Sequence, residues 1–289
     1  MVAVSVGVPV YNGADRLRAS LQCLRDQTFT DFEVLVFDND STDETGDIAR
    51  EFAEQDSRFH YVRQTENVGP FINFIDALDA AQGKYFFWRA HDDLSDLNYI
   101  EVLHKLLDDN PQAYLAASRV FNTNSDGSET FTFPVPDASA STRVGRIRKM
   151  LFRAHPSWVY ALWRREAITK IIHETHEAYP FPWASDHLML FSPIIDDALV
   201  TTDETTFTQL TRDRPSRARA LTTEMIPARR AYLARCRSET ALRDFSFIER
   251  LQMHFLIRQH TSDRCYGLRK IGRRLLHEMV HGRPANPEA

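Results

Sequence analysis

The first hundred residues alternate short apolar runs with amphipathic segments. The apolar runs predict four strands, at residues 2–10, 32–37, 59–63 and 85–88. Each run is followed by apolar residues at helical spacing, such as Leu17, Leu21 and Leu24 after the first strand. Because strands that alternate with helices over short loops form parallel sheets, we expect an α/β fold with a doubly wound, mainly parallel sheet.

Two of the predicted helices carry end signals. Residues 41–44, Ser-Thr-Asp-Glu, are typical of a capping box that opens a helix with Ile48 and Phe52 facing inward. The next helix is expected to close at Gly83. Its predicted apolar face comprises Phe71, Phe74, Ile75 and Leu78.

The pattern changes in the second half of the chain. Strands are predicted at residues 114–121, 131–135 and 158–163, and a helix is expected from Arg164. From about Thr211 the chain becomes helical and rich in Arg. We therefore expect three parts, which are residues 1–112, 113–211 and a basic helical segment at 212–289.

Charge and composition exclude several classes of protein. The chain carries 35 Lys and Arg against 40 Asp and Glu, but residues 212–289 alone hold 17 basic and 8 acidic residues. The acidic body argues against nucleic acid as a partner, because a phosphate backbone needs a cationic surface. Three Cys without a CxxC pair indicate a reducing compartment such as the cytoplasm. Neither a signal peptide nor a membrane-spanning run is predicted.

Familiar catalytic motifs are also missing from the sequence. There is no GxxxxGK[ST], no GxGxxG after the first strand and no GxSxG. These absences argue against a P-loop enzyme, an ordinary dinucleotide-binding enzyme and an α/β-hydrolase. The His173/His176 and His277/His281 pairs lack a nearby third ligand, so we interpret them as exposed helical residues rather than zinc ligands.

Polar clusters follow three of the predicted strands directly. They are Tyr11-Asn12, Asp38-Asn39-Asp40 and Asp92-Asp93. In an open α/β sheet, the carboxyl ends of the strands form the ligand-binding crevice. The pattern therefore predicts that these three loops meet at one site.

Four ordered blocks of sequence resemble the family 2 glycosyltransferases, which have the GT-A fold. The blocks are VSVGVPVYNG at residues 4–13, LRDQTFTDFEVLVFDNDSTDET at 24–45, Asn67-Val68-Gly69, and AQGKY at 81–85 followed by Asp92-Asp93. The likeness weakens from residue 113 and is faint after residue 220. The resemblance implies that 1–112 binds a nucleotide-sugar, that 113–211 binds the acceptor, and that a sugar is transferred with inversion.

The resemblance also implies which residues contact the nucleotide. Tyr11 would flank the base, and Asp38 would accept a hydrogen bond from it. Gly69 would allow close approach of the backbone, whereas Asn67 is equally well explained as a turn residue. Many relatives place an Arg near the nucleotide. Here Asn73 would take over part of the role of that Arg, unless Arg212 or Arg214 does so. The implied nucleotide contacts are Pro9, Tyr11, Asp38, Asn67, Gly69, Asn73 and Asp92.

The adjacent carboxylates Asp92 and Asp93 correspond to the metal motif of the family. The resemblance implies Mg²⁺ or Mn²⁺, with Asp93 as the direct ligand and Asp92 on the ribose or on a metal-bound water. The alternative is an acidic pair favoured by the dipole of the next helix. Many relatives carry another Asp at the position of Ala90, and this departure weakens the case for tight metal binding.

Residues of the second half are expected to serve the acceptor and the diphosphate. Asp186 would act as the general base, or would be an ordinary helix N-cap. Trp183 would stack on a sugar ring or pack in the core, and His155 and Trp158 are weaker acceptor candidates. Either Arg212 or Arg214 would bind the diphosphate.

The predicted activity is therefore metal-assisted transfer of a sugar to an acceptor hydroxyl. The expected donor is a nucleotide-diphospho-sugar, with UDP weakly preferred, and the expected acceptor is a glycan or a lipid-linked glycan. A sugar nucleotidyltransferase and an inactive nucleotide- or glycan-binding module are the alternatives. The apolar stripe of residues 268–280, with basic flanks, predicts either peripheral contact with the inner face of a membrane or a helix packed on the domain.

Overall fold

The computed structural model describes residues 2–124, 130–137, 139–211 and 221–281. The chain forms two compact units. The first comprises Met1–Val135, His155–His173 and Asp197–Arg212, and the second comprises Pro136–Ala154, Glu174–Asp196 and Asp213–Ala289. The structure thus divides the predicted middle part, 113–211, between two units. The roles predicted for the three parts stay predictions.

The first unit is built on one sheet with the strand order β3-β2-β1-β4-β8-β6-β9-β5, and β7 pairs with β6. The first four strands are parallel, as their alternation with helices predicts. Their bounds are β1 Val4–Val10, β2 Phe32–Asp38, β3 Phe59–Arg63 and β4 Tyr85–Trp88. In register, Val10 lies opposite Asp38, which lies opposite Arg63, so the three strands end together.

The remaining strands make the sheet mixed. β8 (Leu162–Arg164) runs antiparallel between β4 and β6 (Leu115–Asn124), and β9 (Leu199–Thr211) runs parallel to β6. β5 (Leu94–Ser95) pairs antiparallel with β9, and β7 (Thr130–Phe133) pairs antiparallel with β6. The predicted α/β class with a mixed, mainly parallel sheet is confirmed.

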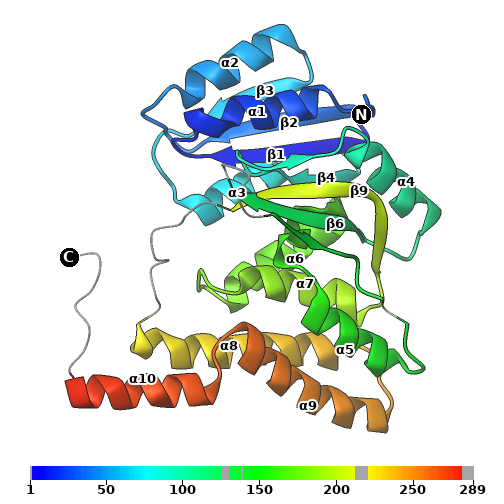
Figure 1. Cartoon of the computed structure of the whole chain (residues 1–289), viewed down its shortest axis with the longest axis vertical. Helices are drawn as coiled ribbons and strands as arrows, with labels where there is room; N and C mark the ends of the chain where they lie inside the picture. The colour runs from blue at the N-terminus through cyan, green and yellow to red at the C-terminus, as the bar shows by residue number, and fades with distance from the viewer. Residues whose placement is uncertain (1, 125–129, 138, 212–220, 282–289) are drawn as a thin grey trace. The chain divides into compact units, whose positions relative to one another are not determined.

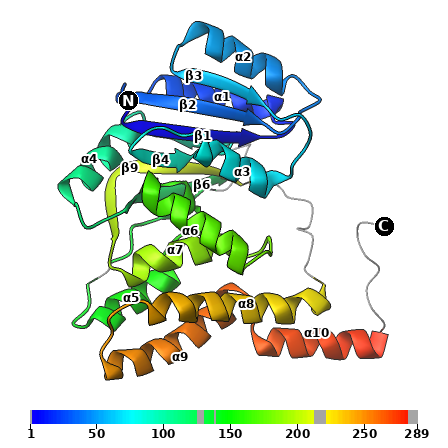
Figure 2. The same ribbon diagram turned by 180° about the vertical axis from the view of Figure 1, so that it is seen from behind.

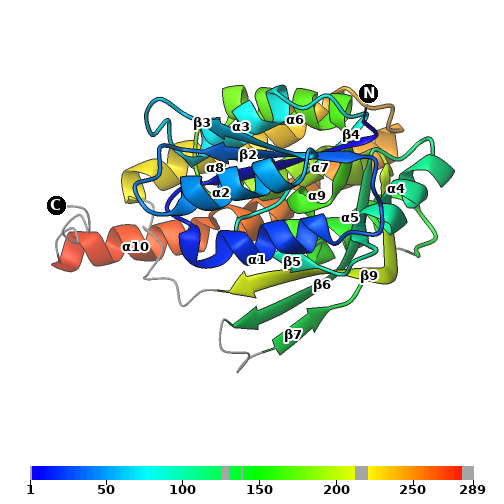
Figure 3. The same cartoon turned by 90° about the horizontal axis from the view of Figure 1, so that it is seen from above.

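Helices cover both faces of the strands β1 to β3. Figure 3 shows α1 and α2 on one face and α3 on the other. The helices of this unit are α1 Ala14–Arg25, α2 Thr45–Gln55, α3 Pro70–Asp79, α4 Tyr99–Asp109 and the first part of α6 (Arg165–Ala178). Gly7 lets α3 approach the sheet closely, since a Cβ on Gly7 would lie only 3.2 Å from the Ala77 Cβ.

Three local expectations are wrong. The predicted capping box does not form, because Ser41 accepts a hydrogen bond from the Asn12 amide (2.9 Å) and α2 begins later, at Thr45. α3 ends at Asp79 rather than Gly83, and its buried face contains Asn73 in place of Phe71 and Phe74.

Residues 158–163 do not form a single strand. A 3₁₀ helix, η1 (Pro156–Tyr160), precedes the short strand β8. Pro156 occupies the first turn, where its fixed φ and missing N–H favour a helical start. His155 caps this turn by accepting a hydrogen bond from the Ser157 amide.

The second unit is helical, as the sequence from Thr211 predicts. Its helices are α5 Arg143–Arg153, the end of α6, α7 Ser185–Ile195, α8 Thr222–Ala241, α9 Phe247–Arg264 and α10 Leu268–His281. Figures 1 and 2 show α9 and α10 both lying along α8. Among the residues described, no helix is long and apolar enough to cross a membrane.

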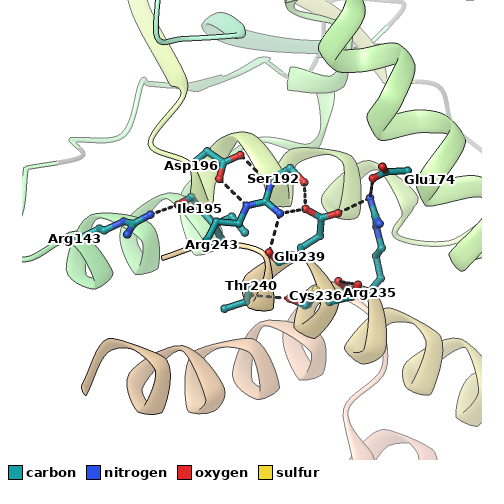
Figure 4. Close-up of polar contacts among 11 residues, drawn as sticks. Arg143, Glu174, Ser192, Ile195, Asp196, Arg235, Cys236, Glu239, Thr240 and Arg243 are labelled. Atoms are coloured by element: carbon teal, nitrogen blue, oxygen red, sulfur yellow. Dashed lines mark hydrogen bonds and ion pairs between the residues drawn. The ribbon is translucent and has the colours of Figure 1, made fainter. Parts of the chain in front are cut away.

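A buried ionic network joins α6, α7 and α8 (Figure 4). Glu239 is 4% exposed and pairs with both Arg235 (2.6 Å) and Arg243. Arg243 also binds both carboxylate oxygens of Asp196, at the end of α7, at 2.7 and 2.9 Å. Arg235 reaches Glu174 of α6 at 2.9 Å. Because the charges are paired, burial does not leave any of them uncompensated.

Candidate functional site

Three strand-end loops meet in the first unit, as the sequence predicts. The Asn12 side chain accepts a hydrogen bond from the Thr42 amide (2.9 Å), and the Gly13 amide donates to the Thr45 hydroxyl (2.9 Å). These bonds join the loops after β1 and β2. The loop after β4 joins them through His91, whose ring lies so close that a Cβ on Gly13 would sit 2.5 Å from it. A side chain at residue 13 would therefore require the His91 ring and Val10 to shift.

Tyr11 and Pro9 occupy opposite environments at the end of β1. Tyr11 is 48% exposed, whereas Pro9 is buried in the sheet. Asn12 and Asp40, which follow the ends of their strands, both adopt positive φ (48° and 61°), a conformation that Asn and Asp tolerate better than most residues. The Tyr11 side chain is therefore accessible to a ligand, and its contact with a base stays a prediction.

Asp38 is fully buried at the end of β2. One of its carboxylate oxygens accepts a hydrogen bond from the Ser41 amide (2.9 Å), and the other accepts one from the Tyr61 hydroxyl (2.8 Å). Burial, together with the Asp38 charge, raises the pKa of Tyr61. A carboxylate has about four lone-pair sites, so these two bonds leave acceptor capacity for a base. The contact between Asp38 and a nucleotide stays a prediction.

A set of amide side chains shapes the loop after β3. Asn39, which belongs to the predicted polar cluster after β2, donates to the Asn67 side chain (2.9 Å) and accepts from the Val68 amide (2.9 Å). The Asn67 oxygen also accepts from the Gly69 amide (2.9 Å), and Gly69 has φ 83°. Asn73 is buried and donates to the Phe37 carbonyl (2.9 Å). All of these side-chain amides form hydrogen bonds within the protein, and the predicted nucleotide contacts of Asn67 and Asn73 stay predictions.

The two carboxylates after β4 differ in exposure. Asp93 is 2% exposed, and its Oδ1 accepts a hydrogen bond from the Leu210 amide (3.3 Å) on β9. Asp92 is partly exposed. The Asp93 amide donates to the Ala90 carbonyl (3.2 Å), which closes a turn. Asp92 is therefore the more accessible carboxylate of the pair.

Arg89 is a buried cation that the sequence interpretation missed. It has no exposed surface, and it donates to the Asp93 carbonyl (3.3 Å) and to the Ser95 hydroxyl (2.8 Å). Its guanidinium lies 5.7 Å from the ring centre of Tyr99 and 5.6 Å from that of Phe207. The detectable signal was a charged residue at the end of an apolar run, three residues before the acidic pair. Arg89 places a fixed positive charge beneath the acidic turn.

The residues at this turn fit a hard divalent cation. Mg²⁺ is commonly held by one or two carboxylates together with substrate phosphates. Asp92 and Asp93 supply two adjacent carboxylates, and Asp92 is accessible. In the described part of the chain no group of three or more His, Cys, Asp and Glu side chains could hold a metal by itself.

The two acceptor candidates of the first unit are engaged in packing. Trp158 is 3% exposed and donates from its indole nitrogen to the Ser118 carbonyl (2.9 Å). His155 is partly exposed and its ring centre lies 4.4 Å from that of Phe133. His155 is thus the more accessible of the two. The acceptor contacts of both residues stay predictions.

Asp186 lies in the first turn of α7, in the second unit. It is partly exposed, and its Oδ1 lies 2.7 Å from the His187 amide. Asp186 is not the N-cap of α7: Ala184 holds that position, with φ 62°. The N-cap alternative for Asp186 is therefore wrong. The Tyr179 hydroxyl donates to the Trp183 carbonyl (2.7 Å) and holds the backbone just before this strained residue.

Two histidines of the second unit, His187 and His260, lie close to each other. His260 is buried, and desolvation lowers its pKa to about 3. Its Nε2 is 2.9 Å from the Tyr232 hydroxyl, and its ring centre is 6.5 Å from that of His187. Burial also lowers the pKa of His187, against the opposing charge of Asp186. Burial thus disfavours the charged form of both imidazoles.

Trp183 packs against a small apolar cluster formed by Met225 and Ile271. Its ring centre is 6.5 Å from that of Tyr266, edge to face. This placement supports the core-packing alternative for Trp183, and its acceptor role stays a prediction. Arg212 and Arg214, the diphosphate candidates, lie outside the described residues, since the description of β9 ends at Thr211.

The fold defines an α/β class of protein built on one mixed, mainly parallel sheet, and the sequence places the chain in a known family. The family model for "Glycosyl transferase family 2" matches residues 5–172. This chain belongs to that family. The match covers β1 to β4, their loops and the acidic turn, which confirms the resemblance found in the sequence.

Curated relatives are similar over part of the chain. Glycosyltransferase GlyA of Streptococcus pneumoniae is 34% identical over 121 residues, which are 42% of this chain and 17% of that protein. The putative teichuronic acid biosynthesis glycosyltransferase TuaG of Bacillus subtilis is 36% identical over 90 residues, which are 31% of this chain and 36% of that protein. The matched region spans less than two thirds of each of these relatives.

Solved structures confirm the GT-A fold. Residues 1–349 of TarS from S. aureus, in complex with UDP-GlcNAc, align with a TM-score of 0.67 at 17% identity, over 90% of this chain and 73% of that one. The mannosyltransferase PcManGT from Pyrobaculum calidifontis, in complex with GDP-Man and Mn²⁺, aligns with a TM-score of 0.55 at 18% identity, over 99% of this chain and 78% of that one.

Proposed function

We propose that this protein transfers a sugar from a nucleotide-diphospho-sugar to an acceptor hydroxyl with inversion at the anomeric carbon. The observation that carries the proposal is the joining of three strand-end loops around an exposed Tyr11 and an accessible Asp92, in a member of glycosyl transferase family 2. Structural neighbours in complex with UDP-GlcNAc and with GDP-Man support a nucleotide-sugar donor.

In this proposal the nucleotide half of the donor is bound by the first unit. The exposed Tyr11 ring covers one face of the base, and Asp38 accepts a hydrogen bond from its edge. Gly69 has positive φ, and no atom lies within 4 Å of the place where a Cβ would stand, so the ligand can approach the backbone there. Asp92 and Asp93 would hold Mg²⁺ or Mn²⁺, which when bound would neutralise the charge of the diphosphate.

Asp186 is the proposed general base. The acceptor oxygen attacks the anomeric carbon, its proton passes to the Asp186 carboxylate, and the bond to the diphosphate breaks as the nucleoside diphosphate leaves. Arg212 or Arg214 would bind the leaving diphosphate. Arg89 holds the turn that bears Asp92 and Asp93 through the Asp93 carbonyl, so it acts as a positioning residue.

The proposed acceptor is a glycan or a lipid-linked glycan, used at the inner face of the membrane. A relative named for teichuronic acid biosynthesis supports a polysaccharide precursor. The apolar stripe of α10 supports peripheral contact, because Leu268, Met279 and Val280 are each 66% exposed or more.

Release of nucleoside diphosphate from a panel of nucleotide-sugars tests the proposal. The purified chain is incubated with each donor, with Mn²⁺ or with a chelator, and hydrolysis is followed without an acceptor. We expect one donor or a few to be hydrolysed in the presence of metal. Hydrolysis of no donor, or equal hydrolysis with the chelator, would contradict the proposed metal-assisted transfer.

A further inference from the structure

The C-terminal helix α10 exposes most of its apolar stripe. Ile271 is 4% exposed, but the other apolar residues of the stripe face solvent. They are Leu268 at 68%, Leu275 at 40%, Leu276 at 61%, Met279 at 82% and Val280 at 66% exposed. Contiguous exposed apolar surface of this kind marks an interaction site in soluble domains. α10 therefore packs on the domain through Ile271 but leaves most of its apolar stripe uncovered, and the two predictions for this helix both stay open.

Charge decides which partner this face suits. At 3.6 residues per turn, Leu268, Leu275 and Met279 lie on one line along α10. Arg269 and Arg273 lie about 100° and about 140° around the helix from that line, next to Leu276 and Val280. Both arginines are exposed. The acidic residue of the helix, Glu278, is already bonded to Thr222 and to Arg274 (3.3 Å). An apolar face flanked by exposed arginines is complementary to an anionic lipid surface.

A second copy of the chain suits this face less well. Two-fold pairing would place the same surface on both sides of the interface. Arg269 and Arg273 of one copy would then lie in an interface that offers Glu278 as its acidic partner, and Glu278 is engaged. Lipid headgroups supply the missing negative charge, so we commit to a lipid surface as the occupant.

The inner side of α10 contacts the segment that carries Asp186. Ile271 is buried with Met225 of α8, and Trp183 packs against this pair. The Trp183 carbonyl accepts a hydrogen bond from the Tyr179 hydroxyl (2.7 Å), and the next residue, Ala184, has the strained φ of 62°. Asp186 follows two residues later. Trp183, against which α10 packs, and the candidate base Asp186 are thus parts of one short segment.

We propose that α10 docks on an anionic lipid surface and that the docked helix, through Ile271 and Trp183, fixes the segment that bears Asp186. The inference rests on the proposed role of Asp186 as the base. A strained backbone persists only where its surroundings over-determine it. α10 supplies part of those surroundings, so its position affects the conformation of the segment that bears Asp186. A lipid surface that binds α10 favours the state in which α10 is packed against Trp183 and Asp186 is held in place.

Sedimentation with vesicles tests the docking. Full-length protein is mixed with vesicles of phosphatidylglycerol and phosphatidylcholine, or of phosphatidylcholine alone. We expect binding to the first and not to the second, loss of binding in the double variant Leu276→Asp/Met279→Asp, and a loss of about fivefold in affinity for Arg269→Gln. Leu242→Asp is the matched control, since Leu242 is 78% exposed at the C-terminal end of α8 and lies outside α10.

Two results would overturn the docking. One is a wild-type protein that stays in the supernatant at low salt, or a double variant that sediments as the wild type does. The other is a wild-type dimer in sedimentation velocity that the double variant converts to monomers, because the face would then be a contact between copies.

Nucleoside diphosphate release with and without the same vesicles tests the coupling. We expect anionic vesicles to accelerate hydrolysis by the wild type, whereas Ile271→Ala binds vesicles and is not accelerated, and the conservative Ile271→Val recovers the acceleration. Acceleration is expressed for each variant as the ratio of its rate with vesicles to its own rate without them. Acceleration of Ile271→Ala equal to that of the wild type would refute the coupling. If no donor is hydrolysed at all, the proposed function and the coupling are both contradicted. The sedimentation experiment tests the docking independently of that outcome.

Discussion

At the acidic turn after β4, two opposite charges are buried within a few residues of each other. Arg89 is fully buried and Asp93 is 2% exposed, and the Arg89 guanidinium bonds the Asp93 carbonyl rather than leaving this backbone to solvent. Buried charges are costly unless they are paired and hydrogen-bonded. The local arrangement therefore favours a turn that is rigid before any ligand binds, with Asp92 as its accessible carboxylate.

Replacement of Asp93 tests the metal assignment at the residue scale. We expect Asp93→Ala to lower metal-dependent donor hydrolysis by at least about a hundredfold, since a bound metal contributes several kcal/mol to such a reaction. Asp109→Ala is the control, because Asp109 is an exposed carboxylate at the end of α4. Donor hydrolysis is measured across a Mn²⁺ titration. A variant with wild-type turnover and Mn²⁺ dependence would remove Asp93 from the metal site and leave Asp92.

Replacement of Asp186 tests the base. Asp186→Asn keeps the shape of the side chain and removes its ability to take a proton, so we expect the transfer rate to fall by about 10²–10⁴-fold. Donor affinity, measured by calorimetry, should change only a few-fold, because a base acts on the acceptor. Asp244→Asn, at an exposed carboxylate before α9, should leave both quantities unchanged. A near-normal rate for Asp186→Asn would mean that another group takes the proton.

At the scale of elements, the ionic network of Figure 4 fixes α7, which begins next to Asp186, against α8. Glu239 accepts from the Ser192 hydroxyl (2.9 Å) as well as from its arginines. Removing one partner of a buried ion pair leaves the others uncompensated. The network therefore matters for the position of α7 and for the stability of the second unit.

Glu239→Ala is expected to lower the free energy of unfolding by about 3–5 kcal/mol, because Arg235 and Arg243 would remain buried without their shared carboxylate. Urea unfolding followed by helical circular dichroism measures the change. The control is Glu51→Ala, which breaks an exposed pair with Arg18 (side chains 42% and 54% exposed) and should cost less than about 1 kcal/mol. Equal losses of unfolding free energy in the two variants would show that the buried network stabilises the protein no more than an exposed ion pair does.

For the molecule as a whole, stability should depend on pH through His260. Its pKa is about 3 in the folded protein, below the usual value of about 6.5 for unfolded chains. Between these values the unfolded state binds the proton and the folded state does not, so stability falls as pH falls below about 6.5. From pH 7 to pH 5 this single group lowers the free energy of unfolding by about 2 kcal/mol.

Urea unfolding at pH 7 and pH 5 checks this expectation. His260→Gln, which retains a partner for the Tyr232 hydroxyl, should remove about 2 kcal/mol of the difference between the two pH values. His254→Gln, at an exposed histidine of the same helix, should leave the difference as in the wild type. If His260→Gln preserves the full pH dependence, His260 titrates normally in the folded protein.

Local pattern was enough to predict much of the nucleotide-binding half. The period of apolar residues identified β1 to β4 and the helices between them, because each face must be buried against a neighbour. Turn residues after the strands located the loops at one edge, and the family's motifs lie in these loops. The capping box failed because Ser41 bonds Asn12, a residue 29 positions away, which no local window contains.

Burial and long-range partners were decided only by the tertiary structure. The period of the sequence could not tell that Asp38 and Asp93 are buried, since their partners Tyr61 and Leu210 lie 23 and 117 positions along the chain. The stripe of α10 was visible in the sequence, but its exposure was not, because a helix has the same apolar period whether its face meets a protein core or a lipid surface. Periodicity encodes which residues share a face, and packing decides what that face meets.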